Sequence, residues 1–220
     1  MTKVKICGIQ RPEDALVAAE AGADYIGLVF VPERYRRLDI GPAKDIVSVL
    51  RTSAEQVPQV VGLFGDQPLV AVNEIIEACD LDLAQLCGGE SLEYCRQVRS
   101  QVIKGVHVDG SAGEPAAVEA LAERVVVYRN AGYLVTLDRL FEGLHGGTGH
   151  SFDWGIASQL SGRGISFLLA GGLTPENVSR SVAEVNPWGV DVSSGVETNR
   201  VKDHAKIRSF VSNARGQTAV

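Results

Sequence analysis

Apolar and β-branched residues recur along the chain in short runs, and most of the stretches between these runs have the apolar spacing of a helix. The runs predict strands at Val4–Gly8, Tyr25–Phe30, Gln59–Phe64, Leu81–Leu86, Val102–Val108, Tyr133–Asp138, Ile165–Ala170 and Val190–Val192. The intervening stretches predict helices at Pro12–Ala21, Pro42–Leu50, Leu69–Ala78, Leu92–Arg99, Pro115–Arg124, Trp154–Leu160, Pro175–Val185 and Asp203–Ala214. Strict alternation of strand and helix is typical of a parallel sheet covered by helices.

The number of strand–helix units predicts the fold class. Eight units in 220 residues favour an α/β fold in which eight parallel strands close into a single-domain (βα)8 TIM barrel spanning residues 1–220. An open sheet is the alternative, because periodicity does not report closure. In such barrels the chemistry lies at the C-terminal ends of the strands, and phosphate is often held after strands seven and eight.

The last two predicted strands both run into turns suited to an anion. Gly171-Gly172 lets a bound group approach the backbone closely, because glycine has no Cβ. Thr174-Pro175-Glu176 then has the pattern of a helix N-cap followed by a proline and an acid. Ser193-Ser194-Gly195 offers hydroxyl and N–H groups after the next strand. Two ordinary tight turns are the alternative, but two in succession favour a phosphate site.

The composition of the chain bears on whether it binds nucleic acid or a membrane and on whether its cysteines are reduced. The chain is 45% hydrophobic with a formal net charge of -6, so it can bury one core and has no basic footprint for nucleic acid. We expect neither a signal peptide nor a membrane span, since no apolar run is long enough. The four cysteines, Cys7, Cys79, Cys87 and Cys95, have neither disulfide-scaffold density nor a metal-binding spacing. We therefore expect a reduced, cytoplasmic protein without a metal site.

The end of the first strand carries a candidate reactive thiol. Alternation places Lys5 and Cys7 on one face of the strand and the apolar Val4 and Ile6 on the other, so the first pair is expected to face the barrel interior. A buried cysteine can equally be small apolar filler. The Lys5 ammonium favours the thiolate and is expected to lower a thiol pKa that starts near ~8.5. Such a thiolate can act as a general base or as a nucleophile.

Three arginines follow the second strand in the sequence Val31–Arg37. On a loop over the barrel mouth, Arg36 can bind an anionic group such as a carboxylate. A solvated basic loop is the preferred interpretation for Arg34 and Arg37. Farther along the chain, the glycine-rich segment 145–150 has the composition of a loop that moves over a ligand, although such a run is weak evidence on its own.

Polar residues also end or occupy the inner faces of later strands. Gln85 and Cys87 share one face of the fourth strand, where Gln85 can orient a substrate hydroxyl or satisfy hydrogen bonds of the core. Asp138 ends the sixth strand after an apolar run, and a carboxylate there is costly unless it is paired, hydrated or functional. Asp191 in the eighth strand can pair with Lys5 across the barrel, contact substrate, or do both.

These pieces, in this order, resemble the phosphoribosylanthranilate isomerases. The likeness covers nearly the whole chain, and the combined motifs are highly specific. The matching segments are KICGIQRPEDA from Lys5, GADYIGLVF from Gly22, RRLDIGPAKDI from Arg36, VGLFGDQP from Val61, LDLAQLCGGES from Leu81, GGTGHSFDW from Gly146, LAGGLTPENV from Leu169 and GVDVSSGVETNRVKD from Gly189.

The resemblance implies an activity and a division of roles. Members of this family are (βα)8 barrels that catalyse an Amadori rearrangement of N-(5-phosphoribosyl)anthranilate in tryptophan biosynthesis, without a metal or organic cofactor. By position, Cys7 matches the general base and Asp138 the general acid. Arg36 matches the loop arginine and Asp191 an aspartate that contacts substrate. The phosphate cradle corresponds to Gly171, Gly172, Ser193, Ser194 and Gly195.

One departure from the family pattern affects the substrate-binding residues. The family usually has QLHG where this chain has Gln85-Leu86-Cys87-Gly88, so a histidine near the substrate is replaced by Cys87. Loss of this donor is expected to weaken binding or slow the reaction without abolishing it. The partner implied is a small phosphosugar–anthranilate, and the oligomeric state, a monomer included, is left open. The alternatives are a non-catalytic phosphosugar-binding relative and another phosphosugar barrel enzyme.

Overall fold

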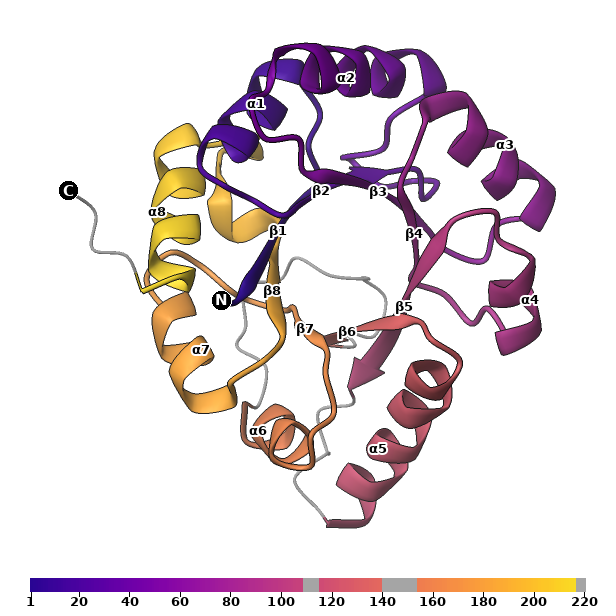
Figure 1. Cartoon of the computed structure of the whole chain (residues 1–220), viewed down its shortest axis with the longest axis vertical. Helices are drawn as coiled ribbons and strands as arrows, with labels where there is room; N and C mark the ends of the chain where they lie inside the picture. Colours follow the sequence, from indigo (N-terminus) through magenta and orange to yellow (C-terminus); the bar gives the residue numbers. More distant parts are fainter. Residues whose placement is uncertain (109–114, 140–153, 217–220) are drawn as a thin grey trace. The chain divides into compact units, whose positions relative to one another are not determined.

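The structure is a computed structural model that describes residues 1–108, 115–139 and 154–216 (Figure 1). Its eight main strands form one closed parallel barrel in chain order, which confirms the predicted fold class. The strands are β1 Lys3–Cys7, β2 Tyr25–Val29, β3 Gln59–Phe64, β4 Leu83–Leu86, β5 Gln101–Val108, β6 Leu134–Arg139, β7 Leu168–Leu169 and β8 Gly189–Val192. The helices are α1 Pro12–Glu20, α2 Ile40–Ser53, α3 Leu69–Cys79, α4 Leu92–Gln97, α5 Pro115–Asn130, α6 Trp154–Gly162, α7 Val178–Val185 and α8 His204–Ala214.

The chain divides into two compact units. One, here called the N-terminal unit, is Lys5–Ile103. The other, here called the C-terminal unit, combines Met1–Val4 with Lys104–Val220. The single domain expected over residues 1–220 stays a prediction.

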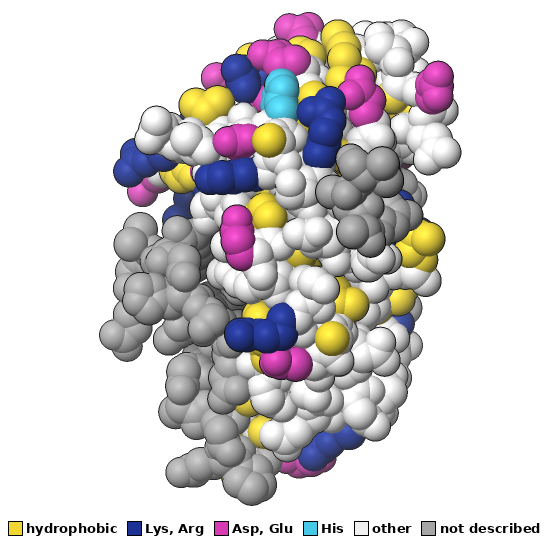
Figure 2. Space-filling view, turned by 90° about the vertical axis from the view of Figure 1, so that its left-hand side faces the viewer, with side chains coloured by type: hydrophobic (Ala, Val, Ile, Leu, Met, Phe, Trp, Pro, Cys, Tyr) yellow, Lys and Arg dark blue, Asp and Glu magenta, His cyan; other side chains and the backbone are white. Residues whose placement is uncertain are grey.

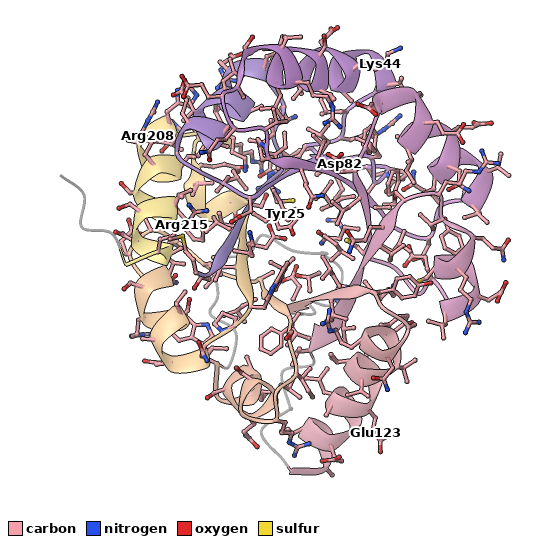
Figure 3. The ribbon with its side chains drawn as sticks, viewed as in Figure 1. Tyr25, Lys44, Asp82, Glu123, Arg208 and Arg215 are labelled. Carbon is pink, nitrogen blue, oxygen red and sulfur yellow. The ribbon has the colours of Figure 1, made fainter. Side chains whose placement is uncertain are left out.

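In the N-terminal unit, strands β2, β3 and β4 pair in parallel and helices α1, α2 and α3 follow one another as neighbours (Figure 1). Every residue of β2 is buried, as expected for a parallel strand. Helix α2 shows the i, i+3, i+4, i+7 pattern that gives one apolar face. Its buried residues are Ala43, Ile46, Val47 and Leu50. Lys44, on the same helix, points away from the strands (Figure 3).

In the C-terminal unit, β6 pairs with β7 and β7 with β8, again in parallel. Helix α8 repeats the amphipathic pattern of α2, and its buried residues are Ile207, Phe210, Val211 and Ala214. Glu123 on α5 and Arg208 on α8 point outward (Figure 3). The helical periodicity of the sequence therefore identified the covering layer of each unit.

The sequence pattern missed one small element that lies between β8 and α8. A short 3-10 helix, η1 Ser194–Val196, leads into an antiparallel hairpin of β9 Glu197–Thr198 and β10 Val201–Lys202. The two turn residues, Asn199 and Arg200, have φ of 52° and 64°. A type I′ hairpin turn needs positive φ at both central positions, and glycine usually occupies at least one of them. Here neither position is glycine, so the turn leaves no sign in the sequence.

The predicted start of the seventh helix was wrong. Helix α7 begins at Val178 with Asn177 as its N-cap, and Thr174 is not the cap of that helix. Thr174 instead starts a separate turn, in which its carbonyl accepts from the N–H groups of Asn177 and Val178. The Asn177 side chain bonds back into this turn, which separates it from the regular helix.

The surface shown in Figure 2 carries mixed charge. On the described residues of that face, Lys and Arg side chains alternate with Asp and Glu, and hydrophobic side chains occur singly or in small groups. Among the helices of the described ranges, none combines the length and hydropathy that crossing a bilayer requires.

Candidate functional site

The Cys7 thiol occupies space that a glycine leaves open in the neighbouring strand. Cys7 ends β1, is 6% exposed, and pairs in register with Gly27 of β2. A Cβ added to Gly27 would lie 2.9 Å from Sγ of Cys7, 3.1 Å from Cα of Cys7 and 3.1 Å from Cδ1 of Leu63. Gly27 therefore determines where the thiol lies. Sequence reasoning missed it, although glycine inside a buried strand signals a close approach.

Arg36 lies on a loop whose backbone is fixed next to β2. Leu38 N–H donates to Val29 O at 2.8 Å, and Arg37 N–H donates to Arg34 O at 2.9 Å. The Arg36 guanidinium stacks on the ring of Tyr35, with its carbon 4.1 Å from the ring centroid. Arg37 instead forms an ion pair with Asp39 at 2.9 Å, in agreement with its interpretation as a solvated loop residue.

Gln85 and Cys87 are brought into contact at the end of β4. The Gln85 Nε2 group donates to Sγ of Cys87 at 3.6 Å. Oε1 of Gln85 is buried and accepts no hydrogen bond from the described residues. A buried acceptor without a partner is costly in a folded protein, so this oxygen is a candidate for contact with a bound hydroxyl.

The turn after Cys87 is held by the loop that follows β3. Gly89 N–H donates to Oδ1 of Asp66 at 2.7 Å, and Asp66 N–H donates to Oε1 of Glu90 at 2.9 Å. Gly88 packs so closely against the Asp66 carboxylate that a side chain at this position would overlap it. These contacts fix the path of the chain immediately after Cys87.

Asp138 and the Gly171-Gly172 turn lie side by side in the C-terminal unit. Leu137 and Leu169 are register partners in β6 and β7, and Ala170 N–H donates to Leu137 O at 2.8 Å. Asp138 is half-buried and follows Leu137 directly. The acid and the first glycine turn therefore leave adjacent strands at the same level. Asp191, 7% exposed, lies in the next strand, β8.

The two predicted turns contact each other. Gly171 and Gly172 have φ of 91° and 67°, values that favour glycine. Gly195 packs against the carbonyl of Leu173, and a Cβ added there would lie 2.9 Å from the carbonyl carbon and overlap the oxygen. The structure thus joins two segments that are separate in sequence into one glycine-lined corner.

Asn177 cross-links the first of these turns. Its Oδ1 accepts from Thr174 N–H at 2.8 Å, and its Nδ2 donates to Gly172 O at 2.9 Å. The Thr174 hydroxyl donates to the Glu176 carboxylate, and this bond is the main reason that the pKa of Glu176 is lowered. Sequence reasoning missed Asn177, because an asparagine inside a predicted helix gives no sign of this role.

The residues proposed from the sequence are divided between the two units. Cys7, Arg36, Gln85 and Cys87 belong to the N-terminal unit. The C-terminal unit contains Asp138, Asp191, Gly171, Gly172, Ser193, Ser194 and Gly195. The approach of Cys7 to Asp138 and the pairing of Asp191 with Lys5 therefore stay predictions. The glycine-rich segment 145–150 lies outside the described residues.

Cysteine and metal chemistry can be stated for the described ranges. None of the four cysteines, all of which the structure describes, forms a disulfide. Burial raises the pKa of the Cys79 thiol, and Lys44 opposes this shift. Over residues 1–108, 115–139 and 154–216, no group of three or more His, Cys, Asp or Glu side chains is arranged to hold a metal ion.

Comparison with known proteins shows which family this chain resembles in sequence. The family model described as "N-(5'phosphoribosyl)anthranilate (PRA) isomerase" matches residues 4–213. An N-(5'-phosphoribosyl)anthranilate isomerase of a Geobacter species is 46% identical over 216 residues, covering 98% of this chain and 98% of that protein.

Solved structures agree with the sequence relatives. Phosphoribosyl anthranilate isomerase from Thermotoga maritima superposes with a TM-score of 0.83 at 36% identity, over 98% of this chain and 100% of that one. A phosphoribosyl anthranilate isomerase solved in complex with reduced 1-(o-carboxyphenylamino)-1-deoxyribulose 5-phosphate gives a TM-score of 0.80 at 35% identity, with the same coverage.

Proposed function

Since the chain belongs to the N-(5'-phosphoribosyl)anthranilate isomerase family, we propose that Cys7 and Asp138 are the base and the acid of its reaction. The activity is an aldose–ketose isomerisation in tryptophan biosynthesis. N-(5-phosphoribosyl)anthranilate becomes 1-(o-carboxyphenylamino)-1-deoxyribulose 5-phosphate. The first two steps of this reaction need one proton delivered to the ring oxygen and one removed from C2′, and the final tautomerisation adds a proton at C1′ and removes the proton of the C2′ hydroxyl.

Asp138 is the proposed acid. Protonation of the ribose ring oxygen opens the furanose and leaves a Schiff base between C1′ and the anthranilate nitrogen. Asp138 is half-buried at the end of β6, next to the turn that carries Gly171. A carboxyl group in that position is close to any phosphosugar whose phosphate lies in the glycine-lined corner.

Cys7 is the proposed base. Removal of the C2′ proton by its thiolate gives an enolamine, which tautomerises to the ketone. The thiol is buried at the end of β1 and is positioned over Gly27. Acid and base must act from different sides of one small sugar, and catalytic residues of these barrels commonly come from the ends of different strands.

The corner formed by the two glycine turns is the proposed phosphate site. Contact between Gly195 and Leu173 is the observation that carries the proposal, because it brings the Gly171-Gly172 turn and the Ser194 turn together without interposed side chains. Backbone N–H groups in such turns suit a phosphate. Tight binding of this remote group helps to hold the sugar in its reactive geometry.

The other predicted residues are assigned to the rest of the substrate. Arg36 is proposed to bind the anthranilate carboxylate, because its guanidinium is planar and its loop is fixed beside β2. The buried Oε1 of Gln85 is proposed to accept from a ribose hydroxyl, with Cys87 beside it. Asp191, buried in β8, is proposed as a further substrate contact.

Two experiments test the function. The fluorescence of freshly generated phosphoribosylanthranilate should decay faster when the purified chain is added. Expression of the chain should also rescue a tryptophan auxotroph that lacks the isomerase. Well-folded chain that binds phosphosugar but accelerates nothing would indicate a non-catalytic relative.

A further inference from the structure

A buried ion pair contacts the backbone of Ser193, in the second turn of the proposed phosphate site. The Lys202 ammonium contacts Oε1 of Glu197 at 2.8 Å and also donates to the backbone carbonyl of Ser193 at 2.8 Å. The side chains of Lys202 and Glu197 are 2% and 6% exposed. A lysine so completely removed from water is costly unless its ammonium has a defined task.

The contact with Ser193 constrains the peptide unit that links it to Ser194. The carbonyl and N–H of one trans peptide point in opposite directions, and no peptide bond is cis in the described ranges. Lys202 donates to the Ser193 carbonyl at 2.8 Å, and Val196 N–H also donates to it at a longer 3.4 Å. A carbonyl so held directs the N–H of Ser194 to the side away from the lysine. The next residue, Gly195, already packs against Leu173 of the first glycine turn.

We propose that Lys202 is a positioning residue for phosphate binding: it holds the Ser193 carbonyl and so turns the N–H of Ser194 toward the substrate phosphate. This inference rests on the proposed phosphate site. Glu197 and Lys202 are register partners in the β9–β10 hairpin. The hairpin therefore holds the Lys202 side chain beside Glu197 and within reach of the Ser193 carbonyl. Lys202 does not touch the substrate in this account, and Glu197 neutralises its charge.

Two roles for Lys202, positioning of the Ser193 carbonyl and direct charge attraction of the phosphate, predict different effects of Glu197→Gln on phosphate binding. If Lys202 acted through its charge, Glu197→Gln would strengthen phosphate binding, because a nearby negative charge would be removed. Glu197→Gln leaves the buried Lys202 ammonium without its carboxylate and should lower the stability of the protein. If Lys202 acts through the Ser193 carbonyl, phosphate binding by the folded variant changes by less than about twofold, because that hydrogen bond remains.

The main test is the double variant Lys202→Met/Glu197→Gln, which avoids leaving one buried charge alone. Its inhibition constant for inorganic phosphate and its KM are expected to rise about tenfold, with kcat changed less than about threefold. Lys206→Met is the matched control, since the Lys206 ammonium contacts the carbonyl of Glu197 rather than that of Ser193. An unchanged phosphate constant in the folded double variant would overturn the proposal, as would an equal loss in the control.

A second measurement needs no variant. In the unaltered chain, a phosphate titration followed by amide NMR is expected to shift the Ser194 signal strongly, whereas an unmoved Ser194 amide beside other shifting signals would overturn the role of Lys202. If phosphate neither inhibits the unaltered chain nor shifts any amide of the two turns, the phosphate site itself is wrong and the inference falls with it.

Discussion

The thiol region and the phosphate region both use a glycine that allows a close contact, but the phosphate region adds side-chain hydrogen bonds to its backbone carbonyls. Around Cys7 the deciding feature is packing: Gly27 has no side chain, and the Cys7 thiol occupies the space that a side chain would take. Around the two glycine turns Gly195 likewise allows a close backbone contact, but polar contacts made by Asn177 and by Lys202 are added to it. A packed interior allows little adjustment, whereas a hydrogen-bonded turn can shift slightly when one contact is lost. The first region should therefore lose rate when it is disturbed, and the second should lose affinity.

The largest effect is expected from the reacting groups themselves. Cys7→Ala and Asp138→Asn should each lower turnover about a hundredfold or more, the usual scale of a general acid or base. The decay of substrate fluorescence measures this directly. Cys79→Ala is the control, because Cys79 is also buried but lies at the end of α3. Near-normal turnover in either active-site variant would remove that residue from the mechanism.

Filling the space over Gly27 should have the next largest effect. The new Cβ of Gly27→Ala would press on the Cys7 thiol and on its backbone, so kcat should fall about tenfold to a hundredfold with KM nearly unchanged. Gly41→Ala is the matched control, because nothing lies within 4 Å of its Cβ. Wild-type kcat in Gly27→Ala would show that the thiol position is not critical.

Loosening the first glycine turn should act mainly on affinity. Asn177→Ala removes the hydrogen bonds to Thr174 N–H and Gly172 O, and the phosphate inhibition constant should rise about fivefold, equivalent to roughly 1 kcal/mol. Asn177→Asp keeps the acceptor for Thr174 N–H but sets a carboxylate oxygen against Gly172 O and adds negative charge beside the proposed phosphate site, so it should raise the constant at least as much. A larger loss in kcat than in phosphate affinity would contradict the contrast between the two regions.

The last effect concerns the start of α8 and acts on stability rather than on activity. The carboxylate of Asp203 accepts from the Thr198 hydroxyl and from the N–H groups of Lys206 and Ala205, and these bonds hold its pKa below the ordinary 3.8. A lowered folded-state pKa stabilises the protein above the unfolded value, and this contribution is lost as pH falls through the lower value. Asp203→Ala should therefore cost about 1 kcal/mol at neutral pH and progressively less below about pH 4.

Urea unfolding of Asp203→Ala and of the unaltered chain, carried out at neutral pH and again below about pH 4, measures this difference in unfolding free energy. A difference in unfolding free energy that stays constant with pH would show that the carboxylate charge plays no part in capping α8.

The periodic part of the fold could be predicted from the sequence because it depends on local spacing. Eight alternating strand–helix units predicted the barrel, the structure shows its closure, and β3 has the predicted bounds Gln59–Phe64. The start of α7 was missed because the Asn177 side chain folds back to Gly172, a choice that local propensity does not encode. The β9–β10 hairpin was missed because Asn199-Arg200 takes positive φ without a glycine.

The site could be predicted only where function requires particular residue types at strand ends. Cys7, Asp138 and the two glycine turns were proposed from such positions, and their roles stay predictions. Gly27, Asn177 and Lys202 were not proposed, because the contacts that single them out are with residues distant in sequence or with backbone atoms. Lys202 shows this most clearly, since it contacts the backbone carbonyl of Ser193 as well as the Glu197 side chain, and a motif cannot reveal a contact with a backbone atom.

We propose that one substrate binds with its phosphate at the glycine turns and its sugar within reach of both Cys7 and Asp138. A crystal structure of the chain with reduced 1-(o-carboxyphenylamino)-1-deoxyribulose 5-phosphate tests it most directly. We predict phosphate oxygens on the backbone around Gly172 and Ser194, and the thiol and carboxyl groups within about 3–4 Å of opposite sides of the sugar chain. A phosphate bound elsewhere, or either group out of reach of the sugar, would contradict the account.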